Sequence, residues 1–331
     1  MLAALLAAAW TLAISVGPAA IPVGTAVAVV LERVGLPVAR TWPDVVGAIV
    51  LDLRVPRALL AAVVGAGLAG AGAVFQGVLR NPLADPYVIG VSAGAAFGAT
   101  VALTGFATAG AAVVLVPLLA FAGALGATAL VYGLARRGDD APVEDLLLAG
   151  VAVSAFLGAA VSWLQLSGGE SLQRVIYWLM GGFSGRGWPH VAAATPLVAL
   201  GLAVVWLYGR ELDALLLGDE AARALGVAPA PARRTLVAAG AMMAAAAVAS
   251  AGLIGFVGLI VPHLLRLLVG PGHRRLVPAA ALGGATLLLV ADTAARSALP
   301  GGELPVGILT ALLGAPFFLA VLLRERRRFW T

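Results

Sequence analysis

Long uncharged apolar segments, separated by short polar ones, dominate the chain. A helix that crosses the hydrocarbon core of a bilayer needs about 20 apolar residues. Ten segments approach this length, and the first has no basic residues before it as a signal peptide would. They comprise residues 1–16, 58–79, 88–106, 110–134, 146–166, 191–208, 236–252, 253–269, 278–295 and 306–323. The pattern predicts an all-α membrane protein, a bundle of about ten transmembrane helices in a single domain, residues 1–331.

The longest polar interruption near the start of the chain comprises residues 18–55. It carries Arg33, Arg40, Asp44 and Asp52, so it is too polar to span a membrane. We interpret it as an external connector that includes a short interfacial helix around residues 23–31.

Composition supports lipid as the outer solvent. Hydrophobic residues make up 62% of the chain and charged residues 11%, and the mean hydropathy is +1.04. Soluble domains are roughly 45–50% apolar and about 25% charged. The net charge of +5 does not indicate a nucleic-acid partner, because the arginines lie between apolar spans and form no basic face.

The sequence lacks the residues that several kinds of metal-binding, catalytic and nucleotide-binding site require. Cysteine is absent, and the three histidines (His190, His263 and His273) have no metal-ligand spacing. No catalytic constellation emerges, so we expect no enzyme and no cofactor or metal bound by this chain. All 21 basic residues are arginine, so the lysine of a phosphate-binding P-loop is missing. If ATP drives the protein, another chain binds it.

The distribution of arginine predicts orientation, because cytoplasmic loops are enriched in basic residues. Thirteen arginines fall in the loops on the side of the tail that contains Arg324 and Arg326, and Arg266 lies within the eighth span. The seven on the opposite side are Arg33, Arg40, Arg54, Arg57, Arg174, Arg186 and Arg296. Both termini are therefore expected to be cytoplasmic, in the inner membrane of a bacterium or archaeon.

Small residues recur inside the spans. Gly65, Gly67 and Gly70 match the dinucleotide motif G-x-G-x-x-G, but they lie inside an apolar span without the strand that the motif requires. Other glycines recur at every fourth position from 90 to 98 and at every third from 252 to 258. Helices in lipid associate through close backbone approach, so these glycines predict tight helix packing.

The segment at residues 210–234 is too polar to span and differs from the other loops. Gly218 and Asp219 can cap a short helix, Glu220 and Arg223 are spaced to pair, and Gly226 can end it. An exposed, capped helix between two spans suits either a docking surface or an ordered loop, and physical reasoning leaves the two open.

The sequence of this segment resembles a known signature. EAARALG at 220–226 is similar to the EAA-x-x-x-G motif of importer permeases, and more of the chain resembles the FecCD-type permease family of iron–siderophore, haem and cobalamin importers. The stretches that carry the resemblance are RVPR at 54–57, QGVLRNPLADP at 76–86, GVSAG at 90–94, LLLAGV at 146–151, YWLMGGF at 177–183, GFVGLIVPHLLR at 255–266, ELPVG at 303–307 and GAPF at 314–317. In this order they are highly specific.

The resemblance implies a complex and a set of site residues. The complex would contain a second permease subunit, most simply in a homodimer, together with two cytoplasmic ATPase subunits and an external substrate-binding protein. The binding protein would dock on Arg54, Arg57 and Arg296. The ATPase would receive a coupling helix made of Gly218, Asp219, Glu220, Ala221, Ala222, Arg223 and Gly226. The translocation pathway would include Leu166, Tyr177, Trp178, Met180 and Phe183. The family's hydroxyl gate residues are replaced here by Val143 and Glu144, so no gate is assigned.

The expected function is therefore the permease of an ATP-driven importer for an iron chelate of siderophore type, with cobalamin or haem as alternatives. Gly181-Gly182, where haem permeases often have Gly-Ser, slightly disfavours haem. An ion-gradient-driven secondary transporter is the alternative of another class. Such a transporter needs ionisable residues at mid-membrane to bind the coupling ion. Asp292, Arg296 and Arg266 lie near span ends, and Asp292 and Arg296 are spaced to neutralise each other. A membrane scaffold without a pathway is disfavoured by the EAA-like segment.

Overall fold

In a computed structural model of the protein, the described residues are 1–105, 109–138, 141–299 and 302–328. They form helices joined by short loops, and among them a single β-bridge joins Leu299 and Gly302. The longer helices are α1 (Leu2–Ser15), α2 (Val23–Arg33), α4 (Val55–Val78), α5 (Val91–Gly105), α6 (Ala109–Ala135), α7 (Val143–Ser167), α9 (Trp188–Leu207), α12 (Pro229–Ala251), α13 (Val257–Val269), α14 (His273–Ala295) and α15 (Val306–Arg328). The short helical segments are α3 (Asp44–Ala48), η1 (Ile49–Arg54), η2 (Pro86–Ile89), η3 (Gly169–Ser171), α8 (Leu172–Leu179), α10 (Gly209–Leu216) and α11 (Asp219–Ala224).

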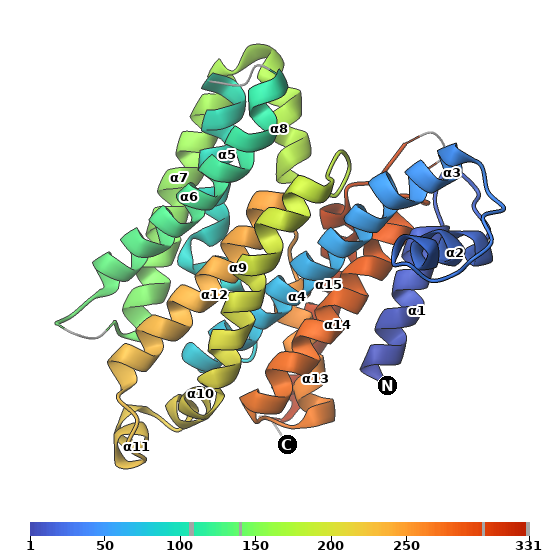
Figure 1. The fold of residues 1–331 in the computed structure, drawn as a ribbon. Helices are drawn as coiled ribbons and strands as arrows, with labels where there is room; N and C mark the ends of the chain where they lie inside the picture. Colours follow the sequence, from blue (N-terminus) through green and yellow to red (C-terminus); the bar gives the residue numbers. More distant parts are fainter. Residues whose placement is uncertain (106–108, 139–140, 300–301, 329–331) are drawn as a thin grey trace.

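Each of the ten predicted spans overlaps one helix of the bundle (Figure 1). Six helical stretches in the described part of the chain are long and apolar enough to cross a membrane: 44–78, 112–135 and 143–167, with α9, α12 and α14. The apolar parts of α1, α5, α13 and α15 are shorter, between 10 and 17 residues. Length and composition thus support six spans, and the total of ten stays a prediction.

The polar connector contains more helix than the sequence predicted. The expected interfacial helix is present as α2, but the second span begins well before residue 58 because α3, η1 and α4 form one continuous stretch from Asp44 to Val78. Pro56 lies at the start of α4, directly after the π-helical turn η1. Proline lacks the amide that an interior helical position would need, and the wider π turn accommodates that loss.

The boundary between α12 and α13 also differs from the prediction. Gly252 ends α12 with a φ of +72°, and Phe256 precedes α13 with a φ of +68°. Residues 253–256 are therefore a non-helical break, which leaves α13 only 13 residues. At its other end α12 is longer than expected, because Pro229 is accommodated at the first helical position.

Helix α4 lies in the middle of the bundle and is mostly buried, as is α12. Its glycines permit this: a Cβ on Gly65 would meet the carbonyl oxygen of Gly284 in α14 at 2.2 Å, and one on Gly72 would meet that of Gly258 in α13 at 1.8 Å. Gly67 and Gly70 face Val198 and Leu202 of α9. The G-x-G-x-x-G stretch is a packing surface, as the sequence predicted.

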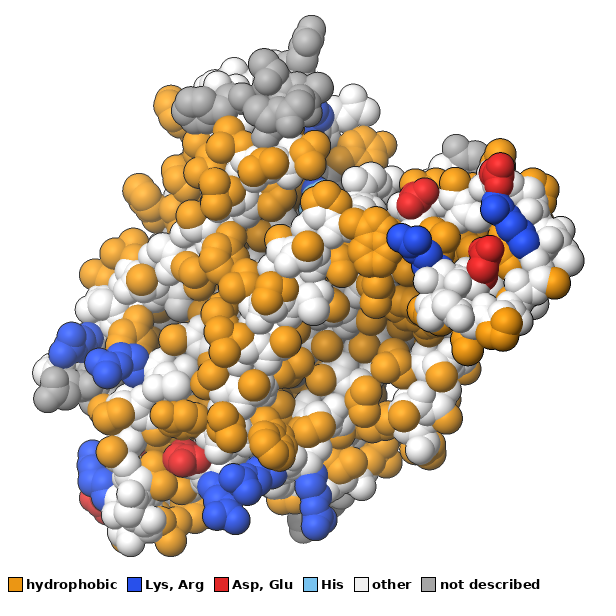
Figure 2. All heavy atoms as spheres, viewed as in Figure 1, with side chains coloured by type: hydrophobic (Ala, Val, Ile, Leu, Met, Phe, Trp, Pro, Cys, Tyr) orange, Lys and Arg blue, Asp and Glu red, His pale blue; other side chains and the backbone are white. Residues whose placement is uncertain are grey.

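Figure 2 shows how apolar and charged side chains are distributed over one face of the bundle. Helices α6 and α7 leave most of their apolar surface uncovered in this chain. On the face shown, apolar side chains surround the middle of the bundle, and basic side chains gather at the end that carries α10 and α11. The start of α1 and the end of α15 lie toward that same end in Figure 1. Both observations agree with a membrane around the middle of the bundle.

Candidate functional site

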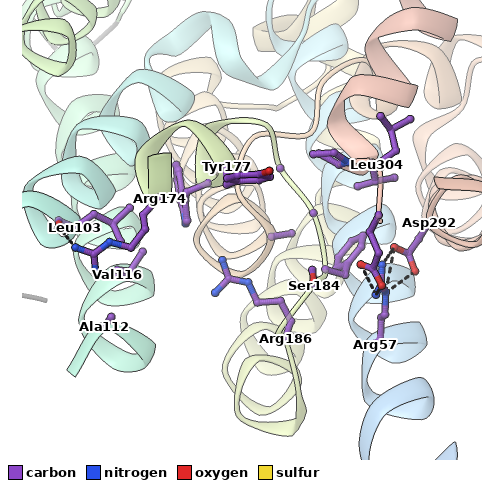
Figure 3. A pocket seen from close by; sticks show the side chains of 18 of the residues that line it. Arg57, Leu103, Ala112, Val116, Arg174, Tyr177, Ser184, Arg186, Asp292 and Leu304 are labelled. Atoms are coloured by element: carbon purple, nitrogen blue, oxygen red, sulfur yellow. Dashed lines mark hydrogen bonds and ion pairs between the residues drawn. The ribbon is translucent and has the colours of Figure 1, made fainter. Parts of the chain in front are cut away.

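Helix α8 lies at the end of the bundle opposite α10 and α11 (Figure 1). Residues of α8 line a cavity of about 750 Å³ (Figure 3). Tyr177 and Trp178 of α8 line it, together with Phe183 in the loop that follows. Met180 and Leu166 are not among its lining residues, and Leu166, near the end of α7, is 88% exposed. The structure thus brings three of the five predicted pathway residues to one cavity.

The loop after α8 shapes one wall, because two glycines hold it against other helices. Gly181 has a φ of +66°, and a Cβ there would meet the carbonyl oxygen of Leu253 at 2.1 Å. The amide of Gly182 donates to the carbonyl of Ala251 at 2.7 Å, and the carbonyl of Gly181 accepts from the amide of Gly307 at 3.3 Å. The Gly-Gly pair therefore holds this wall of the cavity against the end of α12 and the start of α15 through backbone hydrogen bonds.

Arg57 lies at the opposite wall, between two carboxylates (Figure 3). Its Nη2 donates to Oδ1 of Asp292 at 2.8 Å, and its Nη1 lies 2.9 Å from both carboxylate oxygens of Glu303. The Arg57 side chain is 14% exposed and that of Asp292 is 4% exposed. The direct ion pair of Asp292 is with Arg57 of α4. Arg296, the C-cap residue of α14, still interacts with Asp292 electrostatically, as the spacing predicted, but without a side-chain hydrogen bond among the described contacts.

Arg54 and Arg296 are buried, which departs from the expectation of an exposed docking surface. Arg54 donates to the carbonyls of Ile14, Ser15 and Ala19. Arg296 donates to the carbonyl of Ala13 and to the hydroxyl of Thr293. Both guanidinium groups satisfy carbonyls at the C-terminal end of α1, where the helix leaves its last acceptors unpaired. They fix α1 against α14 and the segment before α4.

The predicted coupling segment forms the short helix α11 at the far end of the bundle. Its end has the hydrogen bonds of a Schellman motif: the amide of Val227 donates to Ala222 and that of Gly226 to Arg223. Gly226 has a φ of +81°, which favours glycine. Asp219 pairs with Arg233 of α12 at 2.8 Å.

A second polar contact holds the segment that precedes α11. Asp213 of α10 accepts a hydrogen bond from the ring Nδ1 of His273 at 2.6 Å. Burial alone would raise the pKa of Asp213, but the hydrogen bonds from His273 outweigh it and hold that pKa below its usual value. Sequence reasoning missed this pair because the two residues are distant in the chain.

Two further cavity residues, Arg174 and Arg186, were counted by sequence reasoning only as charges on the outer side. Both line the cavity, beside the aromatic residues expected in the pathway. Their nearness in sequence to Tyr177 and Phe183 is the signal that could have identified them.

The fold, the cavity and the short helix α11 at the opposite end are together those of a multi-pass membrane permease. The chain belongs to the FecCD transport family, whose model matches residues 5–324. It is 50% identical over 284 residues to the cobalamin import permease BtuC of Halobacterium salinarum, covering 86% of this chain and 75% of that protein. It is 43% identical over 289 residues to the hemin permease HmuU of Yersinia pestis, covering 84% of each chain.

The Fe(3+) dicitrate permease FecD of Escherichia coli is 42% identical over 278 residues, covering 84% of this chain and 86% of that one. A solved structure described as an inward-facing putative metal-chelate ABC transporter superposes with a TM-score of 0.84 and 34% identity, covering 98% of this chain and 97% of that one. This protein is therefore an ABC importer permease, a transporter subunit of the prokaryotic inner membrane.

Proposed function

We propose that the protein carries an iron chelate of siderophore or citrate type across the cytoplasmic membrane. The cavity is the observation that supports this most directly: about 750 Å³ with Tyr177, Trp178 and Phe183 in its wall and several charged side chains beside them. Such a volume accommodates a bulky ligand. Cationic groups in the wall favour a chelate that carries negative charge over a neutral one.

Cobalamin is the second candidate. The 50% identity to a cobalamin import permease favours it, since the haem and iron-dicitrate permeases are 43% and 42% identical. Haem is the third candidate ligand, and its support is the 43% identity to the hemin permease.

We further propose that the working complex pairs two permease subunits with two ATPases and an external binding protein. Helix α11 would enter a cleft on the ATPase, because it is short, ends in a Schellman motif and is held away from the bundle core by α10. The side-chain cap expected from Gly218 and Asp219 at its start is absent among the described residues, since glycine offers no side-chain acceptor. At the other end, Arg57 would meet a carboxylate of the binding protein. Arg54 and Arg296 would support that surface indirectly, by holding α1 in place.

The test is uptake by the reconstituted complex. The permease, its ATPase and its binding protein would be assembled in proteoliposomes and supplied with ⁵⁵Fe-labelled ferric chelates, labelled haem or labelled cyanocobalamin. ATP-dependent accumulation of a ferric chelate supports the proposal. Accumulation of cyanocobalamin or haem alone would transfer the assignment to that ligand. Accumulation driven by an ion gradient without ATP would overturn the ATP-driven mechanism.

A further inference from the structure

In the part of the chain that the structure describes, Arg174 and Arg186 have no acidic partner, unlike Arg57 on the same cavity. Arg57 binds both Asp292 and Glu303, the two carboxylates that line the cavity. Within the described residues, Arg174 contacts only neutral acceptors, the carbonyl of Leu103 at 3.5 Å and the hydroxyl of Ser171 at 3.3 Å. The one polar contact of the Arg186 side chain with a described residue is to the His190 ring, at 3.1 Å. Among the described side chains, therefore, no carboxylate pairs with either of these two positive charges.

The surroundings of Arg186 are poor in acceptors. The His190 ring has donors on both sides, Nη1 of Arg186 at its Nε2 and the amide of Gly187 at its Nδ1. A neutral imidazole has one acceptor nitrogen, so it serves one of these donors and not both. Burial also lowers the pKa of Arg186, because it removes water from around the positive charge.

Two buried donors beside the cavity have no hydrogen-bond partner among the described residues. They are Nε of Arg186 and Nε1 of Trp178, and Trp178 is itself more than nine-tenths buried. Leaving a buried donor unsatisfied costs free energy, so the described part of this wall is short of hydrogen-bond acceptors. Figure 3 shows the Arg186 side chain extending into the open space below Tyr177, whereas Arg174 lies along the wall near Leu103.

We propose that Arg186, assisted by Arg174, forms an anion-recognition site that binds the negatively charged oxygens of the transported metal chelate. The permease itself would then select for acidic ligands such as ferric carboxylate complexes, in addition to any selection by the binding protein. Arg186 suits this role because its planar guanidinium group can bind a carboxylate through two parallel hydrogen bonds. This inference deepens the proposed function, since it concerns which chelate the permease accepts.

Equilibrium binding to the permease–ATPase complex, without the binding protein, tests the site. The probes are ferric citrate, which is anionic, and cyanocobalamin, which has no net charge. We expect the wild-type complex to bind ferric citrate with an affinity that falls as salt is added. Arg186→Gln should weaken that binding about tenfold or more, and Arg174→Gln should weaken it less. Arg186→Lys should restore part of it, because the charge returns without the planar fork.

The matched control is Arg33→Gln, which removes one exposed positive charge in α2, outside the cavity, and should leave binding unchanged. Ferric citrate binding that is absent, or equal in the wild type and both cavity variants, overturns the inference. So does a defect that appears only in association with the binding protein, which would make Arg186 a docking residue. The importer assignment is tested separately by ATP-dependent uptake with the binding protein present and survives either failure.

Discussion

Asp213 of α10 and His273, the first residue of α14, are joined by two hydrogen bonds. Oδ1 of Asp213 accepts from the ring Nδ1 at 2.6 Å and from the backbone amide at 3.0 Å. Helix α10 leads into α11, the proposed coupling helix, whereas α14 carries Asp292, the partner of Arg57, near its other end. The pair therefore links the proposed ATPase contact to the helix that forms part of the cavity wall.

Asp213→Asn should uncouple ATP hydrolysis from transport. The amide side chain loses the negative charge that favours the hydrogen bonds from His273, so movement of α10 would reach α14 less directly. We expect fewer chelate molecules transported per ATP hydrolysed in proteoliposomes. Asp44→Asn, an exposed change in α3, is the control and should leave the ratio unchanged. An unaltered ratio in Asp213→Asn would remove this pair from the coupling route.

The pH dependence of stability has a defined sign at Asp213. Its pKa is held below the usual value in the folded protein, so the contribution to stability is present above the unfolded-state pKa of about 3.9. That contribution is lost as the pH falls through the lower folded-state pKa. The thermal midpoint of the detergent-solubilised wild type should fall more steeply below about pH 4 than that of Asp213→Asn. Parallel curves for the two proteins would contradict the assignment.

Gly226→Val should block stimulation of the ATPase by loaded binding protein. A β-branched residue at a φ of +81° costs about 1–2 kcal/mol and would distort the end of α11, although no neighbouring atom lies within 4 Å of the new Cβ. Gly138→Val is the matched control, since Gly138 also has a positive φ and open surroundings but lies in another loop. The ATPase assay in proteoliposomes would then show wild-type stimulation for the control only. Equal stimulation of both variants would show that α11 does not couple.

Gly65→Val should prevent assembly of the bundle. The new Cβ would lie 2.2 Å from the carbonyl oxygen of Gly284, a backbone atom that can move only if α4 and α14 separate. Gly126→Val in α6 adds the same side chain where nothing lies within 4 Å, so it should be tolerated. Size-exclusion chromatography in detergent compares the two. A monodisperse, wild-type-like Gly65→Val protein would contradict the α4–α14 contact.

Changes around Arg57 should shift association with the binding protein in opposite directions. Arg57→Glu should slow complex formation and flatten its dependence on ionic strength, since charges at the rim of an interface act mainly on association rate. Glu303→Gln should accelerate association, because it frees Nη1 of Arg57 from an internal carboxylate.

Surface plasmon resonance at several salt concentrations measures both rates, with Glu32→Gln, an exposed change in α2, as the control. A complementary Glu→Arg change on the binding protein should restore part of the Arg57→Glu loss. If neither variant changes the association rate, Arg57 has no part in docking.

Periodicity and length located the helices with little tertiary information. Apolar runs of near-membrane length leave a helix as the one way to satisfy the backbone in lipid, so α6, α7 and α9 appear where predicted, within a few residues. Glycine spacing likewise predicted close packing at Gly65 and Gly94. The ends of the helices were harder to predict from the sequence. Gly90, expected within the third span, instead ends η2 with a left-handed φ of +86°.

The roles of the arginines depended on tertiary contacts. Arg54, Arg57, Arg174, Arg186 and Arg296 all fall on one predicted side of the membrane, and nothing in their local sequence separates them. The guanidinium group of Arg54 donates to carbonyls at the end of α1 and so stabilises the fold. Arg186 lines the cavity and pairs with no carboxylate among the described residues, which leaves its charge for the proposed ligand. The sequence alone determined the class of protein and gave a prediction of its orientation in the membrane, because both depend on sums over many residues. Only the tertiary structure decided which charge meets which partner, because that depends on side chains brought together from distant parts of the chain.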